Sequence, residues 1–230
     1  MDIAIPVYDD FTALDAIGPY EVLSRLPGAR VRFLGERPGP VRTDNGMLQI
    51  VAEAALEHLP HPDILVVPGG VGTRALVDSE RWRTWIRDAH AHSTWTTSVC
   101  TGSLLLGAAG VLRGLRATSH WLELETLREF GAEPTGERVV VEGKVVTAAG
   151  VSSGIDMALR LVALIAGDDA ARAVQLVIEY DPQPPFDAGS PEKAAPEMVE
   201  GIRQAVAARE ARSRERAAAS RERAASAGSS

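Results

Sequence analysis

The chain has 230 residues and a hydrophobic content of 45%, which suffices for the core of one large α/β domain or of two small domains. Residues 201–230 carry seven arginines and three glutamates, so residues 1–200 carry a net charge of −11 within an overall −7; such an acidic body argues against nucleic-acid binding there. No apolar run reaches the roughly 18 residues that a membrane span needs, so we expect no membrane partner.

Cys100 is the only cysteine of the chain. A single cysteine cannot form an internal disulfide, and the N-terminus shows no basic stretch followed by an apolar run, so the sequence predicts no signal peptide. The expected location is the cytoplasm, where a reducing environment keeps a free thiol available for chemistry.

Apolar runs alternate with amphipathic stretches along the chain. The first strand is expected at residues 2–8 and the first helix at 11–23, with Pro19 in its first turn, where the missing N–H does no harm. Further strands are expected at 29–35, 61–67, 95–99 and 115–119, hairpins at 41–51 and 139–147, and helices at 80–92, 102–109, 121–130, 152–166 and 170–179. This alternation predicts an α/β fold: a doubly wound, mostly parallel sheet with helices on both faces.

The composition changes after Tyr180, where a proline-rich stretch begins. We expect an α/β domain at residues 1–185, a C-terminal arm and helix at 186–208, and a low-complexity Ala/Arg/Glu/Ser tail at 209–230.

The segment around Cys100 is typical of a reactive site. A strand is expected to end at Val99 and a helix to begin at Gly102, so Cys100 lies at the corner, with the small residues Ser98 and Gly102 beside it. This pattern is that of a nucleophile elbow with sulfur in place of hydroxyl. Because a helix N-terminus favours a thiolate, we expect an activated sulfur. The alternative is a small, buried, inert cysteine.

Asp15 is the carboxylate expected to face Cys100, since both follow the carboxyl ends of parallel strands. A carboxyl beside a thiolate tends to hold its proton, so Asp15 is the candidate general acid. The alternative role for Asp15 is a helix N-cap. Asp9, Asp10 and Glu21 are the carboxylates that could substitute for it.

The glycine-rich stretch after the strand at 61–67 lets backbone amides approach a substrate closely. The amides of Gly70 and Val71 are expected to join that of Thr101 in an oxyanion-type pocket, although a tight turn is the alternative interpretation. His120 is a candidate base or orienting group, and its alternative is a structural histidine at a strand end. The other histidines show no ligand spacing, so no metal site is expected: His58, His61, His90 and His92.

Five segments together resemble the ThiJ/PfpI family of the class I glutamine amidotransferase-like superfamily: residues 14–22, 63–70, 98–103, 117–121 and 147–156. The resemblance covers about residues 2–180 and is greatest to the isonitrile (isocyanide) hydratases. Thr101 stands where several other members have a histidine, and Asp15 stands where deglycase and glyoxalase-like members have a glutamate. Several transcriptional activators of the family append a helix-turn-helix region, for which the tail of this chain is too short.

The resemblance implies a flavodoxin-like fold, a homodimer, a small-molecule substrate and no cofactor. It further implies that Cys100 adds to the terminal carbon of an isonitrile while Asp15 delivers a proton, and that water then releases an N-substituted formamide from the thioimidate. Thr101 and Gly70 would hold the adduct. Two alternatives stay open: a glyoxalase or deglycase acting on reactive carbonyls, with His120 moving protons, and a non-catalytic sensor in which Cys100 is oxidised.

Overall fold

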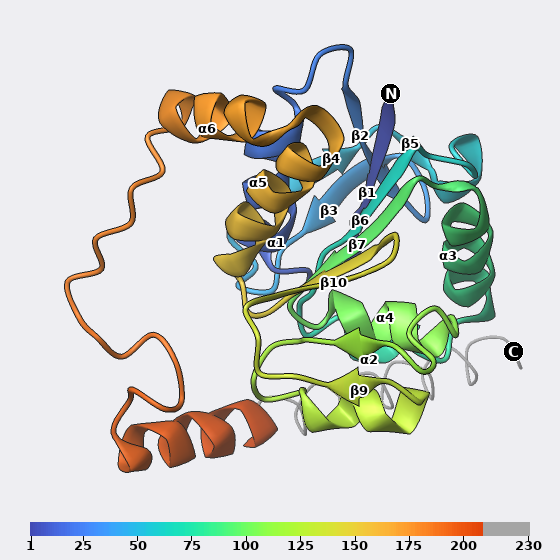
Figure 1. Ribbon diagram of the computed structural model, residues 1–230. Coiled ribbons are helices and arrows are strands. Elements are labelled where there is room, and N and C mark those ends of the chain that lie inside the picture. The colour runs from blue at the N-terminus through green and yellow to red at the C-terminus, as the bar shows by residue number, and fades with distance from the viewer. Residues whose placement is uncertain (209–230) are drawn as a thin grey trace, which may run out of the picture. The chain divides into compact units, whose positions relative to one another are not determined.

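The computed structural model describes residues 1–208, and within them seven strands form one central sheet (Figure 1). The strand order is β10-β11-β7-β6-β1-β2-β5, and all neighbouring pairs are parallel except β10 with β11. The strands of this sheet are β1 (Asp2–Pro6), β2 (Arg30–Gly35), β5 (Ala54–Ala55), β6 (Ile64–Val67), β7 (Trp95–Val99), β10 (Val139–Glu142) and β11 (Val145–Ala148). The mostly parallel sheet expected from the sequence is confirmed.

Helices cover both faces of this sheet. Helices α1 and α5 pack against each other on one face, while α3 lies on the opposite face (Figure 1). The helices are α1 (Ala13–Leu23), α2 (Thr73–Leu76), α3 (Glu80–His92), α4 (Gly102–Ala108), α5 (Ser153–Ala166) and α6 (Asp168–Val177), with 3-10 helices η1 (Leu56–His58) and η2 (Glu125–Phe130). None of the helices among the described residues has the length and apolar character needed to cross a membrane.

The core forms where the central strands are covered on both sides. All four residues of β6 are fully buried, as expected for a strand that reads as a continuous apolar run. On α3, the predicted inner face is buried: Trp82, Trp85, Ile86 and Ala89.

Two strand pairs lie outside the central sheet. The hairpin β3 (Gly39–Arg42) with β4 (Gln49–Ala52) confirms the prediction around Asn45-Gly46. The strand expected at 115–119 is only β8 (Arg116–Ala117), which pairs with β9 (Glu133–Pro134) and not with the central sheet. The prediction of a helix at 121–130 is also wrong in part, because residues 121–124 form turns and only Glu125–Phe130 form a helix, the 3-10 helix η2.

The start of α1 differs from the prediction in a way that concerns Asp15. The N-cap position belongs to Thr12, so Asp15 lies inside the first turn and Pro19 is well within the helix, not in its first turn. Proline has no N–H, so Pro19 cannot donate the usual i→i−4 hydrogen bond to the carbonyl of Asp15. Pro19 is buried and packs against Gly154 of α5, where an added Cβ would lie 3.3 Å from Pro19 Cδ.

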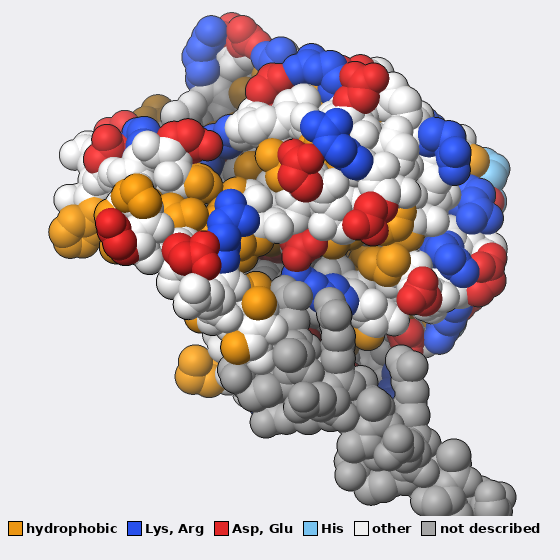
Figure 2. Space-filling view, turned by 90° about the horizontal axis from the view of Figure 1, so that it is seen from below, with side chains coloured by type: hydrophobic (Ala, Val, Ile, Leu, Met, Phe, Trp, Pro, Cys, Tyr) orange, Lys and Arg blue, Asp and Glu red, His pale blue; other side chains and the backbone are white. Residues whose placement is uncertain are grey.

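Residues Met1–Asp181 form one compact unit, and the described residues 182–208 belong to a second. In the second unit, residues 196–208 are helical and residues 182–195 contain turns without helix or strand. The low-complexity tail predicted at 209–230 lies outside the described residues. Figure 2 shows acidic and basic side chains interspersed over one face of the molecule.

Candidate active site

Three adjacent parallel strands place the candidate residues at one edge of the sheet. Strand β6 lies between β1 and β7. Asp15 follows β1, Gly69-Gly70 follows β6, and Cys100 follows β7. Parallel strands bring their carboxyl ends to the same edge, so residues far apart in the sequence meet there.

Cys100 occupies the expected corner between β7 and α4. Its φ of 58° is in the left-handed region, which costs a non-glycine residue about 1–2 kcal/mol. Hydrogen bonds hold this strained backbone on both sides: the Cys100 N–H donates to the carbonyl of Ala149 at 2.8 Å, and its carbonyl accepts from Ser103 Oγ at 3.0 Å and Ser119 Oγ at 3.1 Å. A strained residue held by this many bonds is typical of a functional site.

Asp15 is a fully buried carboxyl next to this corner. The N–H of Gly69 donates to Oδ2 at 2.9 Å, while Oδ1 is buried without a hydrogen-bond partner of normal geometry among the described residues. Burial disfavours the charged form and raises the pKa of Asp15 to about 7, although the Gly69 hydrogen bond opposes part of this shift. Asp15 therefore titrates near neutrality, as a proton-transferring group requires.

The sequence led us to expect an ionised Cys100 sulfur, but the surroundings of the sulfur oppose ionisation. Burial, and next the negative charge of Asp15, raise the pKa of the Cys100 thiol well above its ordinary value. The backbone N–H groups of Thr101 and Val151 face the sulfur and offset only part of this rise. Burial and the charge of Asp15 thus favour a thiol in the resting site and oppose the thiolate that the helix N-terminus favours.

Thr101 and the glycine turn form a compact support for the pair. The N–H of Gly70 donates to Thr101 Oγ1 at 2.9 Å, and the Thr101 hydroxyl lies 3.1 Å from the carbonyl oxygen of Gly70. A Cβ at Gly69 would lie 2.6 Å from the Thr101 nitrogen and 2.8 Å from Asp15 Oδ2, so only glycine fits there. Gly70, with a φ of 136°, likewise approaches the chain at Asp10 and Phe11 too closely for a side chain.

The remaining predicted residues are already hydrogen-bonded or are partly exposed. The Gly70 amide is engaged by Thr101, so it is not a free oxyanion donor in this structure. Val71 is partly exposed in the turn before α2. His120 is partly buried, packs against the Gly150 backbone and accepts a 3.3 Å hydrogen bond at Nδ1 from the N–H of Leu122; burial lowers its pKa.

The structure also decides between the alternatives for Asp15. The N-cap role is wrong, because Thr12 holds that position. Asp9, Asp10 and Glu21 are exposed, and Glu21 pairs with Arg25 on the surface.

Three residues of the site were missed from the sequence: Tyr8, Ser119 and Val151. The buried Tyr8 hydroxyl donates to the carbonyl of Pro68 at 2.7 Å, which holds the glycine turn. Burial, and next the charge of Asp15, raise the pKa of Tyr8. Tyr8 belongs to an apolar run that reads as core, and Ser119 and Val151 carried no signal apart from their places in two of the family-like segments.

Comparison with known proteins agrees with this arrangement. Residues 1–164 match the DJ-1/PfpI family. The chain belongs to the DJ-1/PfpI family. As a DJ-1/PfpI member it is similar to an isonitrile hydratase from Pseudomonas putida, with 41% identity over 207 residues that make up 90% of each chain.

Two further relatives extend the comparison. A crystal structure of a THiJ/PfpI family protein from Pseudomonas syringae is 39% identical and superimposes with a TM-score of 0.87, covering 90% of this chain and 86% of that one. The HTH-type transcriptional regulator CdhR from Pseudomonas aeruginosa is 30% identical over 178 residues, which are 74% of this chain and 51% of the regulator. The resemblance inferred from the sequence motifs is confirmed.

Proposed function

We propose that this protein hydrates an isonitrile to an N-substituted formamide, with Cys100 as nucleophile and Asp15 as the group that moves protons. The observation that carries the proposal is the buried thiol beside a carboxyl whose pKa is raised to about 7. The similarity to an isonitrile hydratase over 90% of each chain supports the same reaction class.

In the first step one proton and one sulfur electron pair move to the substrate. Asp15 accepts the proton of the Cys100 thiol, the sulfur forms a bond to the terminal isonitrile carbon, and Asp15 passes that proton to the same carbon. The product of the step is a thioimidate, S–CH=N–R, and Asp15 is again a carboxylate. The amides of Thr101 and Val151, which face the sulfur, stabilise the negative charge that develops there.

In the second step the Asp15 carboxylate takes a proton from water as the water oxygen adds to the thioimidate carbon. Asp15 passes this proton to the nitrogen, which gives the tetrahedral intermediate S–CH(OH)–NH–R. As the C–S bond breaks, the hydroxyl proton moves to the sulfur by way of the Asp15 carboxylate, so the thiol is restored and the amide R–NH–CHO is released. The sum is one isonitrile plus one water, so neither an electron donor nor an acceptor takes part.

The depth of the site fits a slender reacting group. Cys100 keeps only 5% of its surface exposed and Asp15 keeps none. An isonitrile presents a linear N≡C end with a single exposed carbon, whereas a branched carbonyl carbon carries two substituents. The small exposed fraction of Cys100 therefore favours the isonitrile.

The test is turnover of an alkyl and an aryl isonitrile by the purified protein, followed by the formyl proton signal in NMR. In D2O the formyl carbon should carry deuterium, and in H2(18)O the formamide should carry the heavy oxygen. Cys100→Ala should abolish product, and Asp9→Asn, an exposed carboxylate at the neighbouring strand end, should retain it. Full activity in Cys100→Ala would refute the covalent scheme.

The glyoxalase and sensor alternatives predict different products. Lactate from methylglyoxal, with a rate that falls in His120→Asn, would favour the glyoxalase, and formamide production unaffected by that change would favour the hydratase. Mass spectrometry of the intact protein after mild peroxide tests the sensor, which requires rapid addition of two oxygens to Cys100.

We further propose that the protein works as a cytoplasmic homodimer. Exposed apolar side chains on and beside the β3–β4 hairpin support a covered surface there: Met47, Leu48 and Val51. Light scattering on the purified chain should give twice the monomer mass, and charged substitutions at Met47 and Val51 should give the monomer.

A further inference from the structure

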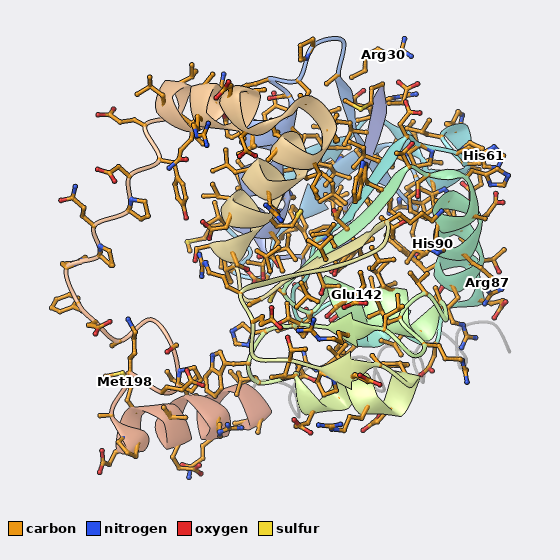
Figure 3. All side chains as sticks on the ribbon, viewed as in Figure 1. Arg30, His61, Arg87, His90, Glu142 and Met198 are labelled. Carbon is orange, nitrogen blue, oxygen red and sulfur yellow. The ribbon has the colours of Figure 1, made fainter. Side chains whose placement is uncertain are left out.

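At the edge of the sheet opposite Cys100, the structure assembles a side-chain cluster that the sequence spacing conceals. His61 precedes β6, while Asp88 and His92 lie one turn apart near the end of α3. His61 lies beside that end of α3, at the periphery of the molecule (Figure 3). Among the described residues, His61, Asp88 and His92 are the group that can present three ligand atoms, all within 4.8 Å of one another.

We propose that His61, Asp88 and His92 bind a divalent transition-metal ion of the zinc class. Two imidazoles and a carboxylate are a donor set that zinc, and other nitrogen-seeking divalent metals such as cobalt and nickel, prefer over magnesium or calcium. With three protein ligands, the remaining positions on the ion are open to water.

The distances are those of a site that needs only small side-chain rotations. His61 Nε2 lies 3.1 Å from Asp88 Oδ2, and the ligand atoms of all three residues lie within 4.8 Å of one another. Zinc bonds of about 2.0–2.2 Å place neighbouring ligand atoms roughly 3–4 Å apart. All three side chains are about half exposed, so they can make this adjustment without moving the core.

A hydrogen bond prepares His92 as a ligand. Its Nδ1 lies 2.9 Å from the backbone carbonyl oxygen of Asp88. A carbonyl oxygen only accepts hydrogen bonds, so Nδ1 carries the proton, and in the neutral ring Nε2 then keeps its electron pair. Metal-binding histidines commonly use this arrangement, because the bond to the second nitrogen fixes the ring and its tautomer.

The facing rings bring the second imidazole into position. The ring centroids of His61 and His92 are 3.7 Å apart, with an angle of 31° between the planes. This stacking holds the loop before β6 against the end of α3. A bound ion would therefore tie together two segments that are 27 residues or more apart in the sequence.

The experiment uses the full chain without a histidine tag, stripped with EDTA and then dialysed free of it. Calorimetric titration with zinc chloride should show one ion bound per chain, and magnesium chloride should show none. Asp88→Asn, His92→Gln and His61→Ala should each weaken zinc binding by at least about 100-fold, because even changes to residues that only support a ligand cost 10–100-fold. Zinc should raise the unfolding midpoint of the wild type and leave that of each variant unchanged.

Two matched controls test whether the zinc ion binds at this cluster and not elsewhere on the chain. His58→Ala removes an exposed histidine three residues from His61, and it should bind zinc as the wild type does. Cys100→Ala should also keep the 1:1 binding. Loss of binding in Cys100→Ala would assign the metal to the catalytic thiol and overturn the proposal. Zinc binding that persists in both Asp88→Asn and His92→Gln would also overturn it. So would a wild-type protein that binds no zinc below about 1 mM. Unfolding midpoints in EDTA show whether each variant is folded.

Discussion

Replacing Asp15 with asparagine should remove activity and stabilise the protein at the same time. Asparagine has nearly the same shape, and its carbonyl can accept the hydrogen bond that Gly69 gives to Asp15 Oδ2. The change removes a fully buried negative charge, because the hydrogen bond from Gly69 offsets only part of the cost of burying it. Formamide production needs a group that moves protons, and an amide cannot replace it.

The size of the stabilisation follows from the pKa of Asp15, which burial raises from 3.8 to about 7. Each pKa unit corresponds to about 1.4 kcal/mol, so the buried charge destabilises the folded protein by about 4 kcal/mol above pH 7. The folded state holds the proton more tightly than the unfolded chain does. The wild type is therefore free of this penalty below about pH 4 and loses stability as the pH rises from 4 to 7.

The assay is urea unfolding of the wild type and Asp15→Asn at pH 5 and pH 8. The stability advantage of the variant should grow by roughly 2–3 kcal/mol between these values, since most of the ionisation of folded Asp15 occurs in this interval. Asp78→Asn, at an exposed position, should differ from wild type by less than about 0.5 kcal/mol at both pH values. An advantage that does not grow with pH would show that Asp15 is not a buried titrating carboxyl.

Substitutions at three positions test the supports of the site. Cys100→Gly should be more stable than Cys100→Ala by about 1 kcal/mol in urea unfolding, because glycine accepts the φ of 58° without strain, and both should be inactive. Gly69→Ala should lower kcat about 100-fold, since its Cβ displaces Thr101 and Asp15 from their positions. Thr101→Val should cost about 1–3 kcal/mol of stability, because the buried N–H of Gly70 loses its acceptor. Thr101→Ser keeps the hydroxyl acceptor, so it should keep the wild-type stability.

The sheet and the elbow were predictable from the sequence because both follow from local patterns. An apolar run such as β6 is buried on both faces wherever helices cover the sheet, and a strand that meets a helix without a loop leaves Cys100 at the corner. The pairing of Asp15 with Cys100 was predicted because parallel strands end at one edge.

The ionisation of the site was not predictable in the same way. The helix N-terminus beside Cys100 is visible in the sequence, and it favours a thiolate. Complete burial and the charge of Asp15 act in the opposite direction, and they depend on segments packed from distant parts of the chain. The pairing of His61 with His92 was missed for the same reason, since the two are far apart in the sequence but their rings stack in the fold.

The raised pKa of the Cys100 thiol affects how readily peroxides oxidise the sulfur between turnovers. Peroxides attack the deprotonated form of a cysteine, so a sulfur that stays protonated between turnovers reacts with them slowly. The chain has no second cysteine to form a rescuing disulfide, and oxidation beyond the sulfenic acid would be permanent. A sulfur that is a thiol at rest and ionises only with substrate thus presents less of the peroxide-sensitive form than a resting thiolate would.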